Sequence, residues 1–351
     1  LDAALRYEDF DDAAGDQLIY KVNGRYEVAD WVAVRASYNT GFRAPTLAQQ
    51  AYSSTTSQFR DLDGDGENEL LLLKNLPVDS AAAVALGATP LKPETSRNAS
   101  FGVTLTPLNN FSLTVDAYQI DVDDRIAVTT TFSPLDARLS ADGVTTIGEQ
   151  IQAILVSNGL SADISGQYYT NAIDTRTKGI DIVATYRLNT DYGDFNLNAG
   201  FNKNETKIRN IVENPAVLAA LGDIEIFDRS KQSSLTDSIP DSKITLGLGW
   251  DYGRFSTNVR GTRFGSYTVR NATNPAADYD VDPAWIADLE LGFKVTEKFT
   301  VFAGANNVFN EYPEQISAPG ATNGSNMYNT FAPFGNRIGV MKSKNFHIGN
   351  I

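Results

Sequence analysis

Apolar and polar residues alternate along most of this chain, with the period of two that an extended strand imposes. Between Trp285 and Val295 every odd position is apolar, whereas the even positions include Asp288, Glu290 and Lys294. The same alternation recurs at residues 32–42, 180–188, 195–201 and 244–250. Each segment therefore has one apolar and one polar face. The apolar faces must either pack against each other or meet lipid.

The connections between these segments fall into two classes. Very short turns lie at residues 29–30, 107–110, 189–193, 251–254 and 296–298. Long connections span residues 44–93, 130–168, 209–240, 271–283 and 312–336. Because the two classes alternate, all short turns fall at one end of the sheet, as periplasmic turns and extracellular loops do. We predict an all-β fold, a partial antiparallel transmembrane β-barrel of about twelve meandering strands.

Two kinds of local irregularity are expected. Within residues 111–122 the apolar phase switches after Ala117, which predicts either a β-bulge there or a Tyr118 side chain turned to the polar face. Three loop segments have helical spacing or an Ala/Leu-rich composition and are predicted to form short helices over the outer mouth. These segments are residues 81–86, 147–155 and 216–221.

Composition excludes several classes of function. The 351 residues include no cysteine, which rules out disulfides, thiolate metal sites and cysteine nucleophiles. The net charge of −14 argues against a nucleic-acid partner. The start at Leu1 shows neither a basic region nor an apolar leader, so we expect a fragment or processed piece of an exported protein.

Four segments resemble, in order and spacing, motifs in the barrels of TonB-dependent receptors. They are WVAVRASYNTGFRAPTL (31–47), LKPETSRNASFGVTLTP (91–107), YYTNAIDTRTKGIDIVATY (168–186) and FAGANNVFNEYP (302–313). In the first, Gly41, Phe42, Arg43, Ala44 and Pro45 match the Gly-Phe-Arg-Ala-Pro turn of the family directly. The resemblance extends from about Leu1 to about Gly335.

This resemblance implies a barrel of about 22 strands in the bacterial outer membrane, with a plug domain inside its lumen. It implies uptake of a scarce ligand, such as a siderophore, a cobalamin or a saccharide, without covalent chemistry. Residues 1–351 are then the C-terminal portion of the barrel, without the plug, and residues 336–351 are an atypical tail. The implied partners are outer-membrane lipid, a small nutrient ligand and, in the full-length protein only, the TonB system and the plug.

Three residues are candidates for contact with a ligand. Arg43 lies at a strand end, and in a complete barrel we expect it either to brace the plug through charge-assisted hydrogen bonds or to contact the ligand. Tyr168 and Tyr169 precede a strand at the loop end, where a platform that stacks on a sugar is an alternative to the membrane-interface girdle that the other strand-end aromatic residues predict.

A candidate metal site lies in the longest predicted outer loop. Asp61, Asp63 and Asp65, followed by Gly66, match the opening of a Ca²⁺ loop, which takes oxygens at its positions 1, 3 and 5. Position 12 of that pattern is Leu72 instead of the bidentate glutamate. A Ca²⁺ site and a solvated acidic turn both remain open at this point.

Two other classes of function compete with transport. A soluble β-rich surface binding module, such as an adhesin, would have to bury the apolar faces against each other. A hydrolase with a histidine base would have to use His347, which is the one histidine of the chain and lies in the atypical tail. The sequence therefore predicts a protein that is not an enzyme.

Overall fold

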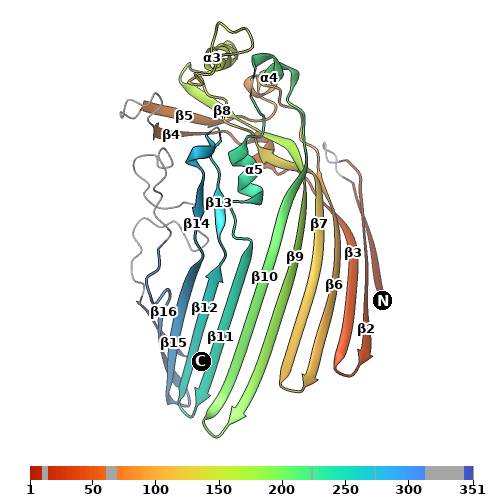
Figure 1. Ribbon diagram of the computed structural model, residues 1–351, viewed down its shortest axis with the longest axis vertical. Helices are drawn as coiled ribbons and strands as arrows, with labels where there is room; N and C mark the ends of the chain where they lie inside the picture. Colours follow the sequence, from red (N-terminus) through yellow and green to blue (C-terminus); the bar gives the residue numbers. More distant parts are fainter. Residues whose placement is uncertain (10–14, 61–68, 223, 273, 313–343, 351) are drawn as a thin grey trace.

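Twelve strands form one antiparallel sheet in which the order of the strands follows the order of the chain (Figure 1). The computed structural model describes residues 1–9, 15–60, 69–222, 224–272, 274–312 and 344–350. The strands of the sheet are β1 (Asp2–Glu8), β2 (Gln17–Ala29), β3 (Val32–Arg43), β6 (Glu94–Leu108), β7 (Phe111–Val128), β9 (Tyr169–Thr190), β10 (Gly193–Ile211), β11 (Ser242–Tyr252), β12 (Phe255–Phe264), β15 (Ala284–Thr296), β16 (Phe299–Ala305) and β17 (Lys344–Asn350). The predicted number of strands is confirmed.

The two ends of the sheet differ as the sequence predicted. Two-residue turns at 30–31, 109–110, 191–192, 253–254 and 297–298 gather at the lower end in Figure 1. The long connections gather at the upper end, and the predicted connection at 44–93 fits the gap between β3 and β6 to the residue. Within the described part of the chain, the sheet is open because β1 and β17 each pair on one side only.

Strand register places the apolar positions on one common face. Leu197 on β10 lies opposite Tyr186 on β9 and opposite Leu248 on β11, and Leu248 lies opposite Val259 on β12. Much of this apolar face is uncovered, since Leu197 is 42% exposed. The other face carries the intervening polar side chains, and these two surfaces are called the apolar face and the polar face below.

The change of apolar phase in β7 arises because the Tyr118 side chain turns to the polar face, which is the second of the two predicted causes. The pairing of β7 with β6 runs without a register shift past Ala117 and Tyr118, so the first alternative, a β-bulge, is not found there. Tyr118 lies on the polar face, where Asn202 Nδ2 donates to its hydroxyl oxygen at 3.4 Å. Its ring occupies the space over Gly179, where a Cβ atom would lie 2.4 Å from Tyr118 Cζ.

The tail predicted to be atypical lies partly within the described residues. Residues 344–350 form β17, which pairs with β16 in antiparallel register. Residues 336–343 and 351 lie outside the described residues.

Short helices and strands fill the long connections. They are α1 (Leu47–Ala51), β4 (Ser54–Arg60), β5 (Glu69–Asn75), α2 (Ala81–Ala85), α3 (Ile147–Ser157), β8 (Ile164–Gln167), α4 (Ala216–Leu221), α5 (Arg229–Thr236), β13 (Tyr267–Val269), the 3-10 helix η1 (Pro275–Ala277) and β14 (Tyr279–Val281). The three predicted helices are confirmed as α2, α3 and α4. In α3 the start is fixed by a capping box, in which Thr146 and Glu149 cap each other's main-chain N–H groups.

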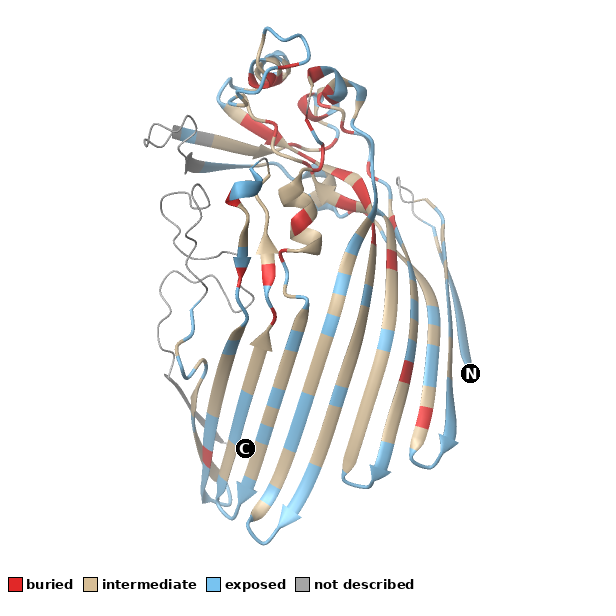
Figure 2. Ribbon diagram, in the orientation of Figure 1, coloured by how far each residue is buried: buried red, intermediate tan, exposed pale blue. Residues whose placement is uncertain are grey.

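The main buried apolar core lies in these connections and in the adjoining ends of β7 and β9, at the upper end of Figure 2. We call it the loop cluster. Its largest fully buried apolar side chains are Tyr168, Phe132, Leu86, Ile147, Ile151, Leu155 and Leu218. Among the described residues, no helix is both long enough and apolar enough to cross a bilayer.

Candidate functional site

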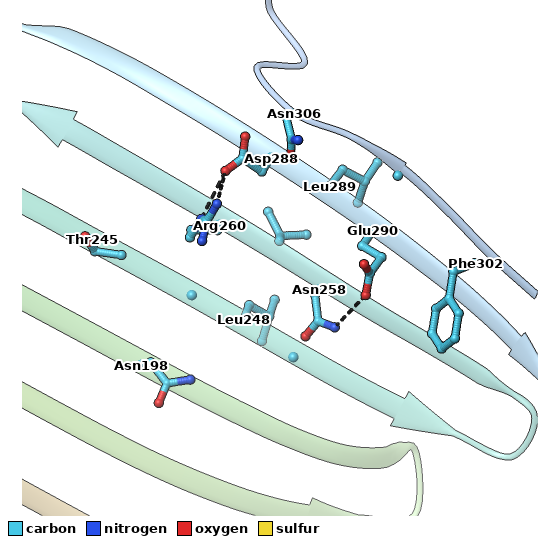
Figure 3. Close-up of a pocket in the computed structure, with 14 residues that line it drawn as sticks. Asn198, Thr245, Leu248, Asn258, Arg260, Asp288, Leu289, Glu290, Phe302 and Asn306 are labelled. Carbon is cyan, nitrogen blue, oxygen red and sulfur yellow. Dashed lines mark hydrogen bonds and ion pairs between the residues drawn. The ribbon is translucent and has the colours of Figure 1, made fainter. Parts of the chain in front are cut away.

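Two grooves lie on the polar face of the sheet. The mid-wall groove, about 650 Å³, crosses β10, β11, β12, β15 and β16 (Figure 3). Arg260 on β12 donates from Nε and Nη2 to Asp288 Oδ2 on β15, at 3.0 and 2.6 Å. The other oxygen of Asp288 accepts the main-chain N–H of Asn307 at 2.9 Å. Beside this pair, Asn258 Nδ2 donates to Glu290 Oε1 at 3.4 Å.

These polar contacts follow from the strand register. Arg260 lies directly opposite Asp288, and Asn258 lies directly opposite Glu290, so each pair shares the polar face of two adjacent strands. A similar pair joins Arg35 on β3 to Asp116 on β7 across β6. Its guanidinium passes Gly102, where a Cβ atom would lie 2.9 Å from Arg35 Nε. The polar face thus presents fixed, hydrogen-bonded charges instead of a packed core.

The loop-end groove, about 550 Å³, lies on the same face where the strands meet the long connections, between the sheet and α5. Its wall includes Arg43 at the end of β3 and Glu94 at the start of β6, which form a two-pronged ion pair at 2.9 and 2.5 Å. Glu94 also accepts the main-chain N–H of Ile126 at 2.7 Å. Both oxygens of this largely buried carboxylate are therefore engaged.

Two further cations line the loop-end groove. Arg125 on β7 donates from Nη1 to Thr175 Oγ1 at 3.4 Å. Lys231 on α5 lies in a partly desolvated position, and this burial lowers the pKa of its amine, although the nearby Asp228 carboxylate acts in the opposite direction. With the Arg43 charge matched by Glu94, the groove carries a surplus of positive charge.

Helix α5 is held over the groove by contacts at its start. Asp228 caps its start by accepting the main-chain N–H of Lys231 at 2.9 Å, and it also accepts the hydroxyl of Thr130 at 2.9 Å. Arg229 forms an ion pair with Asp278 at 2.6 Å, which connects the helix to the loop between β13 and β14. The position of Lys231 therefore depends on contacts with two other long connections.

The structure separates the three predicted ligand-contact residues. Arg43 and Tyr169 both line the loop-end groove. Tyr168 points the other way and is 1% exposed in the loop cluster, where its ring stacks on Phe132 at 5.7 Å between centroids. Its hydroxyl donates to the carbonyl of Leu86 at 2.9 Å, and burial raises the pKa of this hydroxyl. Arg125 and Lys231 were not predicted.

The candidate Ca²⁺ residues Asp61, Asp63 and Asp65 lie outside the described residues, so a metal at this loop stays a prediction. Elsewhere, in the part of the chain that the structure does describe, no group of three or more His, Cys, Asp or Glu side chains is arranged to hold a metal ion.

Comparison with solved structures shows the same sheet architecture in larger proteins. The ferric enterobactin receptor PfeA of Pseudomonas aeruginosa, in complex with BCV-L6, aligns with a TM-score of 0.56 at 16% identity, over 90% of this chain and 38% of that one. The siderophore receptor PirA of Acinetobacter baumannii aligns with a TM-score of 0.53 at 16% identity, over 88% and 39%. At this identity the likeness concerns the fold.

The present chain thus spans less than two fifths of these solved proteins. A comparison with curated protein sequences found no match. The family described as TonB dependent receptor-like, beta-barrel, matches residues 1–308, which include eleven of the twelve strands of the sheet. The chain therefore belongs to the TonB-dependent receptor β-barrel family.

Proposed function

We propose that the chain forms part of the wall of a bacterial outer-membrane transporter, which takes up a scarce small ligand with energy supplied through TonB. The apolar face of the sheet meets lipid, and the polar face lines the lumen. The observation that carries this proposal is the concentration of uncovered apolar side chains on one face. Leu246 and Leu291 on that face are 47% and 48% exposed, which water alone would not favour.

The ligand enters from the side of the long connections and binds first at the loop-end groove. The cations Arg125 and Lys231, which form no ion pair among the described residues, favour a ligand with negative charge, such as an anionic metal chelate. The ring of Tyr169 offers an apolar or stacking contact on the same wall. No bond of the ligand is made or broken in this function, so the task of the groove is selective binding.

The mid-wall groove has a different task. Its Arg260 charge is paired with Asp288 within the sheet, its Glu290 carboxylate accepts from Asn258, and it lies closer to the two-residue turns. We assign this part of the wall to contact with the plug domain of a full-length receptor. Movement of the plug, driven through TonB, then opens the route that the polar face lines.

The placement in the membrane is tested by spin labels on single cysteines, which are unambiguous because the chain has no native cysteine. Labels at Leu289 and Leu291 are expected to report hydrocarbon in reconstituted vesicles, and labels at Asp288 and Glu290 to report a polar surrounding. Water at the two leucines, with a monodisperse protein in the absence of detergent, would favour the soluble surface binding module instead.

The ligand class is tested by equilibrium binding of ferric enterobactin as an anionic chelate, with cyanocobalamin and a neutral oligosaccharide as comparison probes. The double variant Arg125→Gln and Lys231→Gln is expected to weaken binding of the anionic chelate at least tenfold, about 1.4 kcal/mol. The matched control is Arg260→Gln in the mid-wall groove, which should leave this binding unchanged. Equal binding by both variants would overturn the assignment of the loop-end groove.

A further inference from the structure

On the apolar face of the sheet, apolar side chains are replaced by charged side chains toward the loop end. On β10 the positions of this face run through Leu197, Ala199 and Phe201, and then continue as Lys203 and Glu205. On β9 the same change follows Ile182 and Ile180, where the next two positions are Lys178 and Arg176. Strand register aligns these changes, because Lys203 lies opposite Ile180 and Glu205 lies opposite Lys178.

The charged residues beyond this boundary form a continuous group on β6, β7, β9 and β10, which we call the outer belt. Its members are Arg97, Asp121, Asp123, Asp174, Arg176, Lys178, Lys203, Glu205, Lys207 and Arg209. Six of these side chains are cationic and four are acidic, in a chain whose net charge is −14. The outer belt is therefore locally positive on an otherwise acidic molecule.

The arginines of the belt are held in place by carboxylates that lie beneath them. Arg176 donates from Nε and Nη2 to the two oxygens of Asp121, at 2.6 and 3.0 Å. Arg97 donates to Asp123 at 2.8 Å, and the guanidinium of Arg209 reaches Asp123 as well. Arg209 sits at the register shift between β10 and β9, and such an irregularity re-aims a side chain.

Exposure shows which charges this surface offers. The Asp121 side chain is 10% exposed, whereas the side chains of its partner Arg176 and of Arg97 are 39% and 52% exposed. Each guanidinium has five N–H donors, and the ion pairs use only some of them. Lys178 is also exposed and has no ion-pair partner among the described residues. The Glu205 carboxylate is also exposed, at 65%, and pairs with Lys207 at 3.0 Å, so the outward surface of the belt consists mainly, but not only, of positioned cations with donors to spare.

We propose that the outer belt binds the anionic, phosphorylated headgroups of the lipid leaflet on the loop side of the membrane. This inference rests on the proposed placement of the apolar face in lipid. The belt begins where the apolar positions stop, on the same face, which is the depth at which headgroups begin. Arginine recognises phosphate oxygens through paired N–H donors, and lysine adds point charge, so the chemistry of the belt matches this layer.

A lipid occupant is favoured over a protein partner by the shape of the site. The belt follows one boundary across four strands, and its height is set by the apolar face below it. A chain with a net charge of −14 would otherwise be repelled by an anionic leaflet. The belt therefore supplies attraction at the one level where the protein touches headgroups.

The test uses the chain in phosphatidylcholine vesicles that contain a trace of spin-labelled lipid. Electron paramagnetic resonance measures the fraction of label immobilised at the protein surface, with labelled phosphatidic acid compared with labelled phosphatidylcholine. We expect a preference for phosphatidic acid of at least about fivefold, which corresponds to about 1 kcal/mol for one cation near an anionic surface. High salt should reduce this preference.

The belt variant combines Arg97→Gln, Lys178→Gln and Lys207→Gln and is expected to abolish the preference. The matched control removes the same charge from the polar face, with Lys21→Gln, Lys243→Gln and Lys294→Gln, and should retain it. Insertion without any headgroup preference, or an equal loss in both variants, overturns the proposal but leaves the proposed function standing. Failure to insert into neutral and anionic vesicles alike overturns both.

Discussion

The loop cluster and the large sheet use the same apolar residue types in opposite ways. In the loop cluster, Ile151 and Leu155 on α3 are each 1% exposed and pack among other apolar side chains. In the sheet, Leu246 on β11 is 47% exposed although it lies in the middle of a regular strand. The first arrangement is stable in water because it removes apolar surface from it. The second requires another solvent over the apolar face.

This difference separates two sources of stability within one chain. The loop cluster is a small buried core, built from α2, α3, α4, the segments between them and the adjoining ends of β7 and β9. The large sheet has its main-chain hydrogen bonds satisfied between strands, but on its apolar face the side chains of the middle of the strands have no second layer to pack against among the described residues. Substitutions in the two regions should therefore respond differently to the surrounding solvent.

The largest expected loss of stability follows from the introduction of a charge into the loop cluster. Ile151→Asp would bury an unpaired carboxylate and should destabilise α3 and β8 by about 4 kcal/mol. Hydrogen exchange of their main-chain amides measures this local stability. Val156→Asp on the same helix is the control, because Val156 is 48% exposed and should change stability by less than about 0.5 kcal/mol. Equal protection in both variants would mean that this cluster is not a core.

The second largest expected effect is the loss of folding free energy when a charge is placed on the apolar face of the sheet in lipid. Leu246→Arg should reduce the folding free energy in vesicles by about 2 to 4 kcal/mol near the bilayer midplane. Thr245→Arg, one residue away on the polar face, should cost less than about 1 kcal/mol in the same vesicles. Equilibrium unfolding by denaturant measures both variants. A larger cost for Thr245→Arg would reverse the assignment of the two faces.

The sequence was sufficient to predict the sheet because strand alternation and turn length are local signals. The turn between β11 and β12, at residues 253–254, was visible from the alternating residues on either side of it. The helix α3 was visible from the helical spacing of Ile147, Ile151 and Leu155. Each of these patterns is set by neighbours in the chain and needs no knowledge of distant contacts.

The candidate site was predicted less well because it depends on distant contacts. Arg43 and Tyr169 were found from their positions at strand ends, and both line the loop-end groove. Lys231 lies on a short polar helix whose place over the sheet is fixed by Asp278, on another connection. Tyr168 and Tyr169 are adjacent, and the sequence did not show which one turns into the loop cluster.

A third, smaller effect separates these two tyrosines. Tyr168→Phe keeps the stacked ring but leaves the buried Leu86 carbonyl without its hydrogen bond, which should cost the loop cluster about 1 to 2 kcal/mol. Tyr169→Phe should have almost no effect on stability, because its hydroxyl makes no hydrogen bond within the described part of the chain. Thermal unfolding monitored by hydrogen exchange in β8 provides the comparison.

The smallest expected effect lies at the junction of the two regions, where α5 of the long connections rests on the sheet. Burial holds the pKa of Lys231 below its ordinary value of 10.5, so the undocked helix binds more protons than the docked helix in the window just below 10.5. Docking should therefore strengthen as the pH rises through this window, and weaken as the pH falls through the lowered pKa.

A spin label at Ser230→Cys on α5 reports this docking as a loss of mobility. We expect the label to become less mobile as the pH is raised toward 10.5, and we expect Lys231→Met to remove this dependence while the helix stays docked throughout. An anionic ligand in the loop-end groove should oppose the trend, because it stabilises the protonated amine and raises its pKa. A pH response that persists in Lys231→Met would assign the titration to another group. Helix α5 would then be held on the polar face by its ion pairs alone. The surplus positive charge of the groove would not measurably weaken the docking of this helix in the absence of a ligand.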